Sequence, residues 1–144
     1  MKITLIAGGY LKAGPLQLLM KEYEKRLFWK VSVVEVPENT SKNATSLFIE
    51  KIPKDAVVIA LDEMGENLTS PLFTQWIEGK QVEGHSHFCF LIGTADGFDK
   101  SITPHVHKKI AFGKATWPHL MVRVMLLEQL YRAQQIIQGH PYHR

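Results

Sequence analysis

Apolar runs rich in β-branched and aromatic residues alternate along this chain with segments of helical periodicity, and this alternation constrains the fold more than any other feature. The strand-like runs cover residues 2–7, 31–36, 56–61, 87–92 and 109–112. The helical segments cover residues 15–28, 43–52, 72–80 and 118–137. Strands that alternate with helices form a mostly parallel sheet with helices on both faces. The 144 residues fit one α/β domain, residues 1–144.

Local signals define the ends of these helices. Leu16, Met20, Tyr23 and Leu27 are spaced by three or four residues, which favours one apolar face on the first helix. Ser70-Pro71 predicts an N-cap followed by proline at the first helical position. Asn43 is the candidate cap of the second helix.

The final helix carries polar side chains all around its axis, with apolar side chains between them. The polar positions are Arg123, Glu128, Gln129, Arg132, Gln134 and Gln135. A helix with more than one apolar face is buried on more than one face. Two arrangements meet this requirement: a two-fold partner subunit covers the second face, or the helix lies in the centre of its own domain.

Composition excludes several classes of protein. No apolar run approaches the roughly 20 residues that span a bilayer, and the first run is too short for a signal-peptide core. The single cysteine, Cys89, lies in a strand-like run and is expected to be a buried core side chain, which fits a cytoplasmic protein. A net charge of +3 permits an anionic partner without requiring one.

Ligands of parallel sheets bind beyond the carboxyl ends of the strands, so the loops after residues 61, 92 and 112 are the candidate site. Residues 93–98 contain two glycines that let the backbone turn tightly and approach a ligand. Residues 61–65 offer backbone groups and carboxylates, or form a solvated turn. Residues 112–118 suit the binding of a flat ligand. None of these loops matches a dinucleotide fingerprint or a P-loop.

The seven histidines do not show the spacing of a known metal site. His85 and His87 are separated by one residue, as are His105 and His107, but no Glu or Cys stands at a familiar zinc spacing. We therefore expect no metal. His119 opens the last helix, where a positive charge opposes the helix dipole, so we expect it to be neutral and hydrogen-bonded.

The end of the chain resembles a known family. Residues 117–119, 123–124 and 128–133 and the ending His140-Pro141-Tyr142-His143-Arg144 are similar to the ribosomal RNA large subunit methyltransferase H family. The resemblance implies a SPOUT domain with a C-terminal trefoil knot. It also implies an S-adenosylmethionine-dependent enzyme that methylates N3 of a pseudouridine in bacterial 23S rRNA within the assembled ribosome. Family members are homodimers with the last helix near the interface.

The resemblance also assigns cofactor-binding residues to the three candidate loops. These are Leu61, Gly93, Phe112, Gly113, Lys114, Ala115, Thr116 and Trp117. Two departures stand out. The family has a second glycine where this chain has Thr94, and residues 37–54 are shorter than the family pattern.

The terminal residues are the candidate substrate site. His143 is the expected proton acceptor, because a neutral imidazole suits general-base catalysis near pH 7. Tyr142 is expected to stack on or orient the base, and Arg132 and Arg144 to contact phosphate or carbonyl oxygens. Alternatively the tail only docks the RNA and water removes the proton. Asp96 is a further candidate for holding the base edge.

Two other classes of function compete with this hypothesis. A non-catalytic RNA-binding or ribosome assembly factor of the same fold would not bind S-adenosylmethionine. A small redox or hydrolytic α/β enzyme would bind flavin, NAD or a metal, and the sequence contains no motif expected for any of these ligands.

Overall fold

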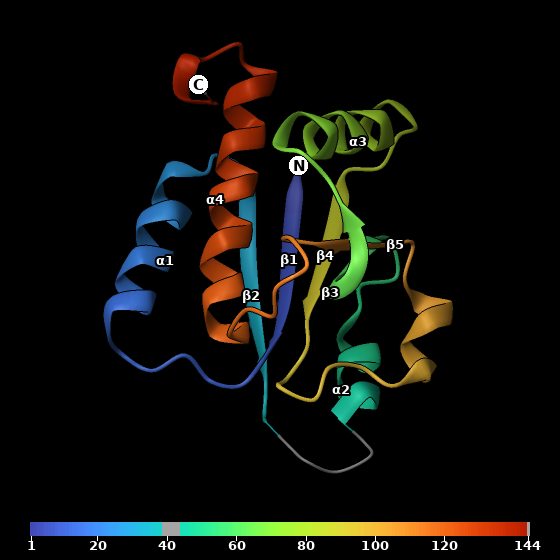
Figure 1. Cartoon of the computed structure of the whole chain (residues 1–144). Helices are drawn as coiled ribbons and strands as arrows, with labels where there is room; N and C mark the ends of the chain where they lie inside the picture. Colours follow the sequence, from blue (N-terminus) through green and yellow to red (C-terminus); the bar gives the residue numbers. More distant parts are fainter. Residues whose placement is uncertain (39–43, 144) are drawn as a thin grey trace.

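The computed structural model describes residues 1–38 and 44–143 and has the predicted α/β architecture (Figure 1). Five parallel strands form one sheet in the order β2-β1-β4-β3-β5. The strands are β1 (Lys2–Gly8), β2 (Lys30–Val36), β3 (Val57–Asn67), β4 (His87–Ile92) and β5 (Lys108–Ala111). The helices are α1 (Pro15–Arg26), α2 (Ala44–Lys51), α3 (Ser70–Val82) and α4 (His119–Ile137), with short 3-10 turns η1 (Lys100–His105) and η2 (Pro141–His143). The mostly parallel sheet predicted from the sequence is confirmed.

Alternate residues of the central strands face two separate cores, as the period of a β-strand requires. Ile3 and Leu5 of β1 join Phe88 and Phe90 of β4 in the larger core. Ile6, one residue further along β1, belongs to a second core on the opposite face. The central strands are therefore buried on both faces, which explains their nearly continuous apolar sequences.

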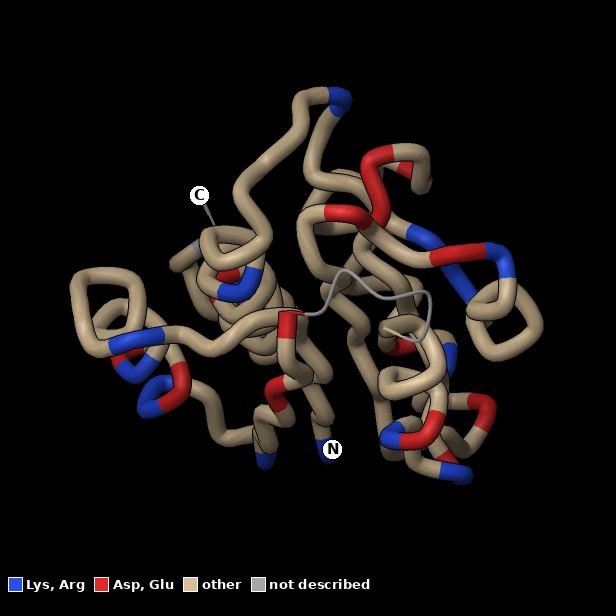
Figure 2. Tube along the Cα trace, turned by 90° about the horizontal axis from the view of Figure 1, so that it is seen from below, with Lys and Arg blue, Asp and Glu red and all other residues tan. Residues whose placement is uncertain are grey.

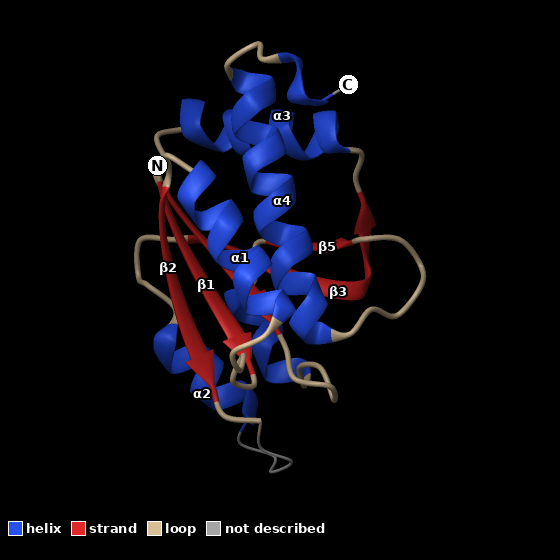
Figure 3. Cartoon of the chain, turned by 90° about the vertical axis from the view of Figure 1, so that its left-hand side faces the viewer, coloured by secondary structure: helices blue, strands red, loops and turns tan. Residues whose placement is uncertain are grey.

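The helices divide between these two faces (Figure 3). Helices α1, α3 and α4 cover the face of the larger core, and α4 contacts both α1 and α3. Helix α2 and η1 cover the other face, where they contact each other. Helix α4 thus lies in the middle of one layer, with the sheet beneath it and a helix on each side.

Strand β3 is longer than the sequence pattern predicts. It continues to Asn67, and its pairing with β5 shifts register between Leu61 and Glu66, which are both opposite Ile110. Such a bulge bends the strand. The prediction of a turn at residues 61–65 is therefore wrong, because the bent backbone keeps its pairing with β5. Gly65 allows this close approach, since a Cβ there would lie 2.7 Å from the Ile110 backbone.

Helix α3 begins one residue earlier than expected. Thr69 is its N-cap, and the Thr69 side chain accepts a hydrogen bond from the Leu72 N–H at 3.3 Å. Ser70, the predicted cap, is the first helical residue and donates through Oγ to Gln129 of α4 at 2.6 Å. Asn43, the candidate cap of α2, lies outside the described residues.

The polar side chains of α4 are buried within their own chain more than the sequence suggests. Gln134 accepts a hydrogen bond from the Phe28 N–H and donates one to the Arg26 carbonyl, each at 3.1 Å. These bonds satisfy backbone groups where α1 ends. Arg123 is fully buried. Much of the scattered polarity of α4 therefore serves contacts inside the domain.

No helix in the described part of the chain is long and apolar enough to cross a membrane.

Candidate functional site

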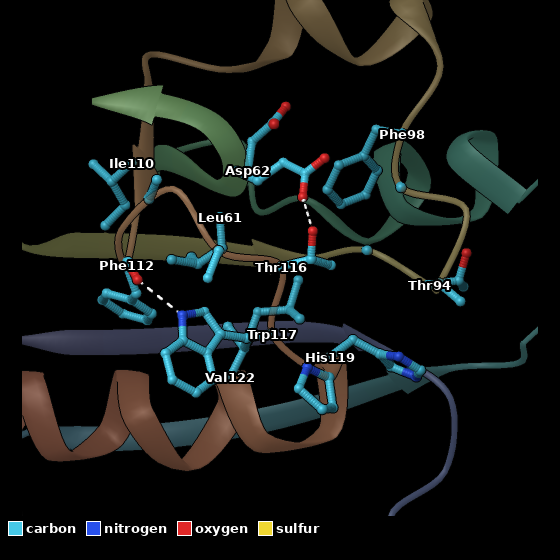
Figure 4. A pocket seen from close by; sticks show the side chains of 18 of the residues that line it. Leu61, Asp62, Thr94, Phe98, Ile110, Phe112, Thr116, Trp117, His119 and Val122 are labelled. Carbon is cyan, nitrogen blue, oxygen red and sulfur yellow. Dashed lines mark hydrogen bonds between the residues drawn. The ribbon is translucent and has the colours of Figure 1, made fainter. Parts of the chain in front are cut away.

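A cavity of about 680 Å³ opens at the carboxyl edge of the sheet, where the bent part of β3 meets the loops after β4 and β5 (Figure 4). The first turn of α4 closes one side. The walls are formed by Leu61, Asp62, Glu63, residues 92–98, residues 110–113, residues 115–119 and Val122. This volume is typical of a small-molecule site.

The loop after β4 approaches the neighbouring backbone closely. A Cβ on Gly93 would lie 3.2 Å from the Gly97 Cα and 3.3 Å from the Phe98 ring. Thr94 and Gly97 close the turn through a β-bridge, and Gly97 has a φ of +70°, which favours glycine. The two glycines of this loop are therefore required by its geometry.

Thr94, which stands where the family has glycine, is buried and turned toward β1. A Cβ built on Gly8 would lie 2.7 Å from the Thr94 Cγ2. The Thr94 methyl therefore occupies space above the end of β1, while the residue still contributes to the cavity wall.

The loop before α4 is fixed by hydrogen bonds to its surroundings. The Gly113 N–H donates to the Asn67 side chain at 2.9 Å, and the Thr116 hydroxyl donates to Glu63 Oε2 at 2.5 Å. Within the loop, the Trp117 indole donates to the Phe112 carbonyl at 2.9 Å (Figure 4). The bent end of β3 therefore holds this loop in place beside the cavity.

All but one of the predicted cofactor-binding residues line this cavity. Lys114 is the exception: it is exposed and does not contribute to the wall. Asp96, the alternative base-holding residue, also lines the cavity and is exposed. The assignment of the remaining residues to the cofactor stays a prediction that their position supports.

A buried arginine beneath the cavity is the functional feature that the sequence reasoning missed. Arg123 is 0% exposed; it donates to Glu35 Oε2 and to the Gly8 carbonyl at 2.7 Å each, and to the Gly9 carbonyl at 2.5 Å. Gly8 adjoins Thr94, so this cation anchors α4 and β2 to the strand end beside the cavity. Its position within the apolar sequence of residues 120–127 was the available signal.

Glu35 is the acid that pairs with Arg123. Burial alone raises the pKa of its carboxyl group, but hydrogen bonds from Arg123 and from the Leu11 N–H outweigh burial and lower it below its usual value. Glu35 is therefore ionised at neutral pH, and the pair is a buried ion pair with one partly exposed member.

His119 differs from its prediction. Its Nε2 lies 3.5 Å from Glu38 Oε1 and is buried, and no hydrogen-bond partner for this atom occurs among residues 1–38 and 44–143. The expected hydrogen bond is therefore not formed by Nε2, which also lies 3.3 Å from the position that a Cβ on Gly9 would take.

Cys89 and His87 are buried side chains of the framework. Burial raises the pKa of the Cys89 thiol to about 12, so the thiol remains protonated, as a core side chain requires. His87 is buried, with Thr4 Oγ1 at 2.8 Å and Asp55 Oδ1 at 3.1 Å. Within the described part of the chain, no three His, Cys, Asp or Glu side chains are grouped to hold a metal ion.

The C-terminal tail packs on the end of α4. The Arg132 guanidinium pairs with Glu128 Oε1 at 2.5 Å and lies over the Tyr142 ring, 5.1 Å from its centroid. The Tyr142 hydroxyl donates to the same carboxylate oxygen at 3.3 Å. Burial and a hydrogen bond with Tyr23 raise the pKa of Tyr142 to about 12. Tyr142 and Arg132 thus meet, as the prediction of a shared substrate site requires.

Two residues of the predicted substrate site are not placed at the level of their side chains. The backbone of His143 ends η2, but its side chain lies outside the described part of the structure. Arg144 lies wholly outside the described residues.

The tail and the cavity lie at opposite ends of α4. Its 19 residues span about 28 Å at a rise of 1.5 Å per residue. His119 at one end lines the cavity, whereas η2 lies beside the other end (Figure 1). Within one chain, Tyr142 therefore does not reach the cavity that its own chain forms.

Comparisons with known proteins identify the family of this chain. A family model described as "Predicted SPOUT methyltransferase" matches residues 1–143. A protein of Bradyrhizobium diazoefficiens named "Ribosomal RNA large subunit methyltransferase H" is 42% identical over 159 aligned positions, covering 100% of this chain and 99% of that protein. Proteins with the same name from Zymomonas mobilis and Dinoroseobacter shibae are 42% and 41% identical, with the same coverage.

The aligned lengths also bear on the short region at residues 37–54. The alignment with the Zymomonas protein spans 144 positions, the length of this chain, whereas the Bradyrhizobium alignment spans 159. Relatives of both lengths therefore carry the same name. With a match along its whole length and a cavity at the carboxyl edge of its parallel sheet, the chain belongs to the SPOUT methyltransferase family and is an S-adenosylmethionine-dependent methyltransferase.

Proposed function

We propose that this enzyme methylates N3 of a pseudouridine in bacterial 23S rRNA, with the assembled ribosome as its substrate in the cytoplasm. The cavity formed by the bent part of β3 and the loops after β4 and β5 is the observation that carries the proposal. The names of the relatives support ribosomal RNA of the large subunit as the substrate. The sequence of the tail, residues 140–144, supports the choice of nucleotide.

The cavity suits S-adenosylmethionine in size and chemistry. Leu61, Phe112 and Trp117 offer apolar surface for a flat adenine ring, and the loop backbones offer hydrogen-bonding groups. Asp62 and Glu63 place carboxylates at the rim, where a cationic ligand is favoured. When bound, this cofactor supplies an electrophilic methyl group on a sulfonium. The protein's part is to orient that group and exclude water from it.

A second copy of the chain is needed to complete the site. The tail and the cavity of one chain are separated by the length of α4. Trp117, Met121 and Leu72 are exposed apolar side chains near the start of α4 and on α3. We infer a two-fold homodimer in which the tail of one subunit lies at the cavity of the other. A SPOUT knot at residues 112–137 would fix the loop before α4, which lines the cavity, and α4 itself, which carries the tail.

The tail residues have separate roles in this proposal. His143 accepts the N3 proton as a neutral imidazole. Tyr142 is uncharged at neutral pH and orients the base by stacking. Arg132 and Arg144 contact phosphate or carbonyl oxygens of the RNA. In the free protein the Arg132 guanidinium pairs with Glu128, so RNA binding replaces part of this ion pair.

Charge alone does not recruit the RNA. Basic and acidic residues are interspersed along the Cα trace (Figure 2), and the net charge is only +3. Affinity then depends on combining the surfaces of two subunits and on the shape of the ribosome. A free RNA stem-loop is expected to be a poor substrate.

Mapping rRNA methylation by mass spectrometry tests the proposal. Purified ribosomes that lack the modification are incubated with the protein and labelled S-adenosylmethionine. We expect one new methyl group, on a pseudouridine of the large-subunit rRNA. Binding of S-adenosylmethionine in calorimetry without methyl transfer to RNA would contradict the substrate. Absence of both would favour a non-catalytic assembly factor.

A further inference from the structure

A guanidinium on α1 lies over two neighbouring aromatic rings at the end of the molecule that carries the tail. The Arg26 Cζ lies 5.6 Å from the centroid of the Tyr23 ring and 5.9 Å from that of the Tyr131 ring. The two rings are 6.3 Å apart and inclined by 52°. Arg26 is thus oriented by α1 and α4 together.

This group is continuous with the predicted substrate residues of the tail. The Tyr131 ring lies edge-on to the Tyr142 ring, with 4.6 Å between centroids. Arg132 covers the other part of Tyr142. Tyr23, Arg26, Tyr131, Arg132 and Tyr142 therefore form one surface, which we call the tyrosine–arginine surface.

The chemistry of the tyrosine–arginine surface suits unpaired RNA bases better than distant phosphates. Arg26 pairs with Glu22 at 3.2 Å and Arg132 with Glu128, so each cation is largely neutralised and its long-range attraction is weak. Planar guanidinium groups and tyrosine rings stack on unpaired bases irrespective of net charge.

The Arg26 guanidinium is partly exposed to solvent, so packing within the protein leaves it accessible to a ligand. Its side chain is 45% exposed, and that of Glu22 is 49% exposed. An exposed i,i+4 ion pair contributes about 0.5 kcal/mol or less to stability. The Arg26 guanidinium, oriented by two neighbouring rings, is therefore available for recognition at little cost to the fold.

We propose that Tyr23 and Arg26 on α1 bind unpaired rRNA nucleotides next to the methylated one and so extend the substrate surface beyond the tail. This inference rests on the proposed rRNA substrate. The Arg26 guanidinium stacks on a base through its planar face or hydrogen-bonds to the base through its edge. The Tyr23 side chain contacts both Arg26 and Tyr142 and so keeps them in place.

Methylation kinetics on ribosomes test this role with two variants of adjacent residues. Arg26→Ala removes the stacked cation, and Lys25→Ala removes an exposed cation one residue away on the same helix. We expect Arg26→Ala to lower kcat/KM for ribosomes about tenfold, within the range for loss of one stacking contact, while kcat at saturating ribosomes and the Kd for S-adenosylmethionine remain unchanged. Lys25→Ala is expected to stay within about twofold of the unaltered protein, as a solvated charge does.

A conservative variant separates stacking from charge. Arg26→Lys keeps the charge and loses the plane, so its kcat/KM is expected to fall close to that of Arg26→Ala. Full recovery in Arg26→Lys, or equal losses in Arg26→Ala and Lys25→Ala, would overturn the stacking role.

The remaining outcomes are also decisive. Arg26→Ala within twofold of the unaltered protein, or a loss of S-adenosylmethionine affinity in this variant, would overturn the inference while leaving the proposed function intact. If the unaltered protein transfers no methyl group to ribosomes, the proposed function fails, and this inference fails with it.

Discussion

Replacing Arg123 with methionine tests the buried ion pair beneath the cavity. The variant loses the pair with Glu35 and the bonds to the Gly8 and Gly9 carbonyls. Breaking a buried pair by removing one partner costs about 3–5 kcal/mol. Because the Glu35 side chain is 30% exposed and keeps its bond to the Leu11 N–H, we expect the lower end, about 3 kcal/mol.

Urea unfolding at fixed protein concentration measures this loss, because the stability of the proposed dimer would depend on concentration. Arg26→Met is the control, because its i,i+4 pair with Glu22 has side chains that are 45% and 49% exposed and is worth about 1 kcal/mol or less. Equal losses of unfolding free energy in the two variants would refute the reasoning. So would a loss below about 1 kcal/mol in Arg123→Met.

The remaining predictions concern burial, close approach and pH. Cys89 in the folded protein should not react with a thiol reagent at pH 8, because its pKa of about 12 leaves almost no thiolate, and reaction before unfolding would contradict its burial. Gly65→Ala should lower the unfolding free energy by roughly 1–3 kcal/mol through its clash with Ile110, and an unchanged urea midpoint would contradict the close approach. The lowered pKa of Glu35 contributes stability above the usual pKa of glutamate that is lost as pH falls through the folded value. Glu35→Gln should therefore flatten the acid limb of the stability–pH curve, and an unchanged limb would contradict the shift.

The parts of the fold that the sequence predicts are those set by local pattern. Strand-like runs and helical periodicity identify the elements, and the parallel arrangement brings residues 61–63 and the loops after β4 and β5 to one edge. The location of the cavity could therefore be predicted from the sequence. Its assignment to S-adenosylmethionine came from the resemblance, because the loop glycines alone match several kinds of ligand site.

Features that depend on long-range contacts were not predictable in this way. Strand β3 extends to Asn67 because Glu66 and Asn67 pair with β5 again after the register shift. The acidic sequence of residues 62–66 does not resemble a buried strand, so the pattern gives no sign of this extension. Thr69 caps α3 in place of Ser70 because the Ser70 hydroxyl donates its hydrogen bond to Gln129, which lies 59 residues later in the sequence. Arg123 is similar: its partners come from β1 and β2, so its burial has no local cause.

A complementation assay tests the central claim, that one subunit supplies the cavity and the other the tail. The first chain is truncated after Pro141, and the second carries Gly93→Leu, whose side chain collides with Gly97 and Phe98 and fills the cavity. Each variant alone should be inactive on ribosomes. After subunit exchange, half of the dimers are mixed and contain one intact composite site, so activity should return to about a quarter of that of the unaltered dimer. A mixture that remains as inactive as either variant would contradict the account.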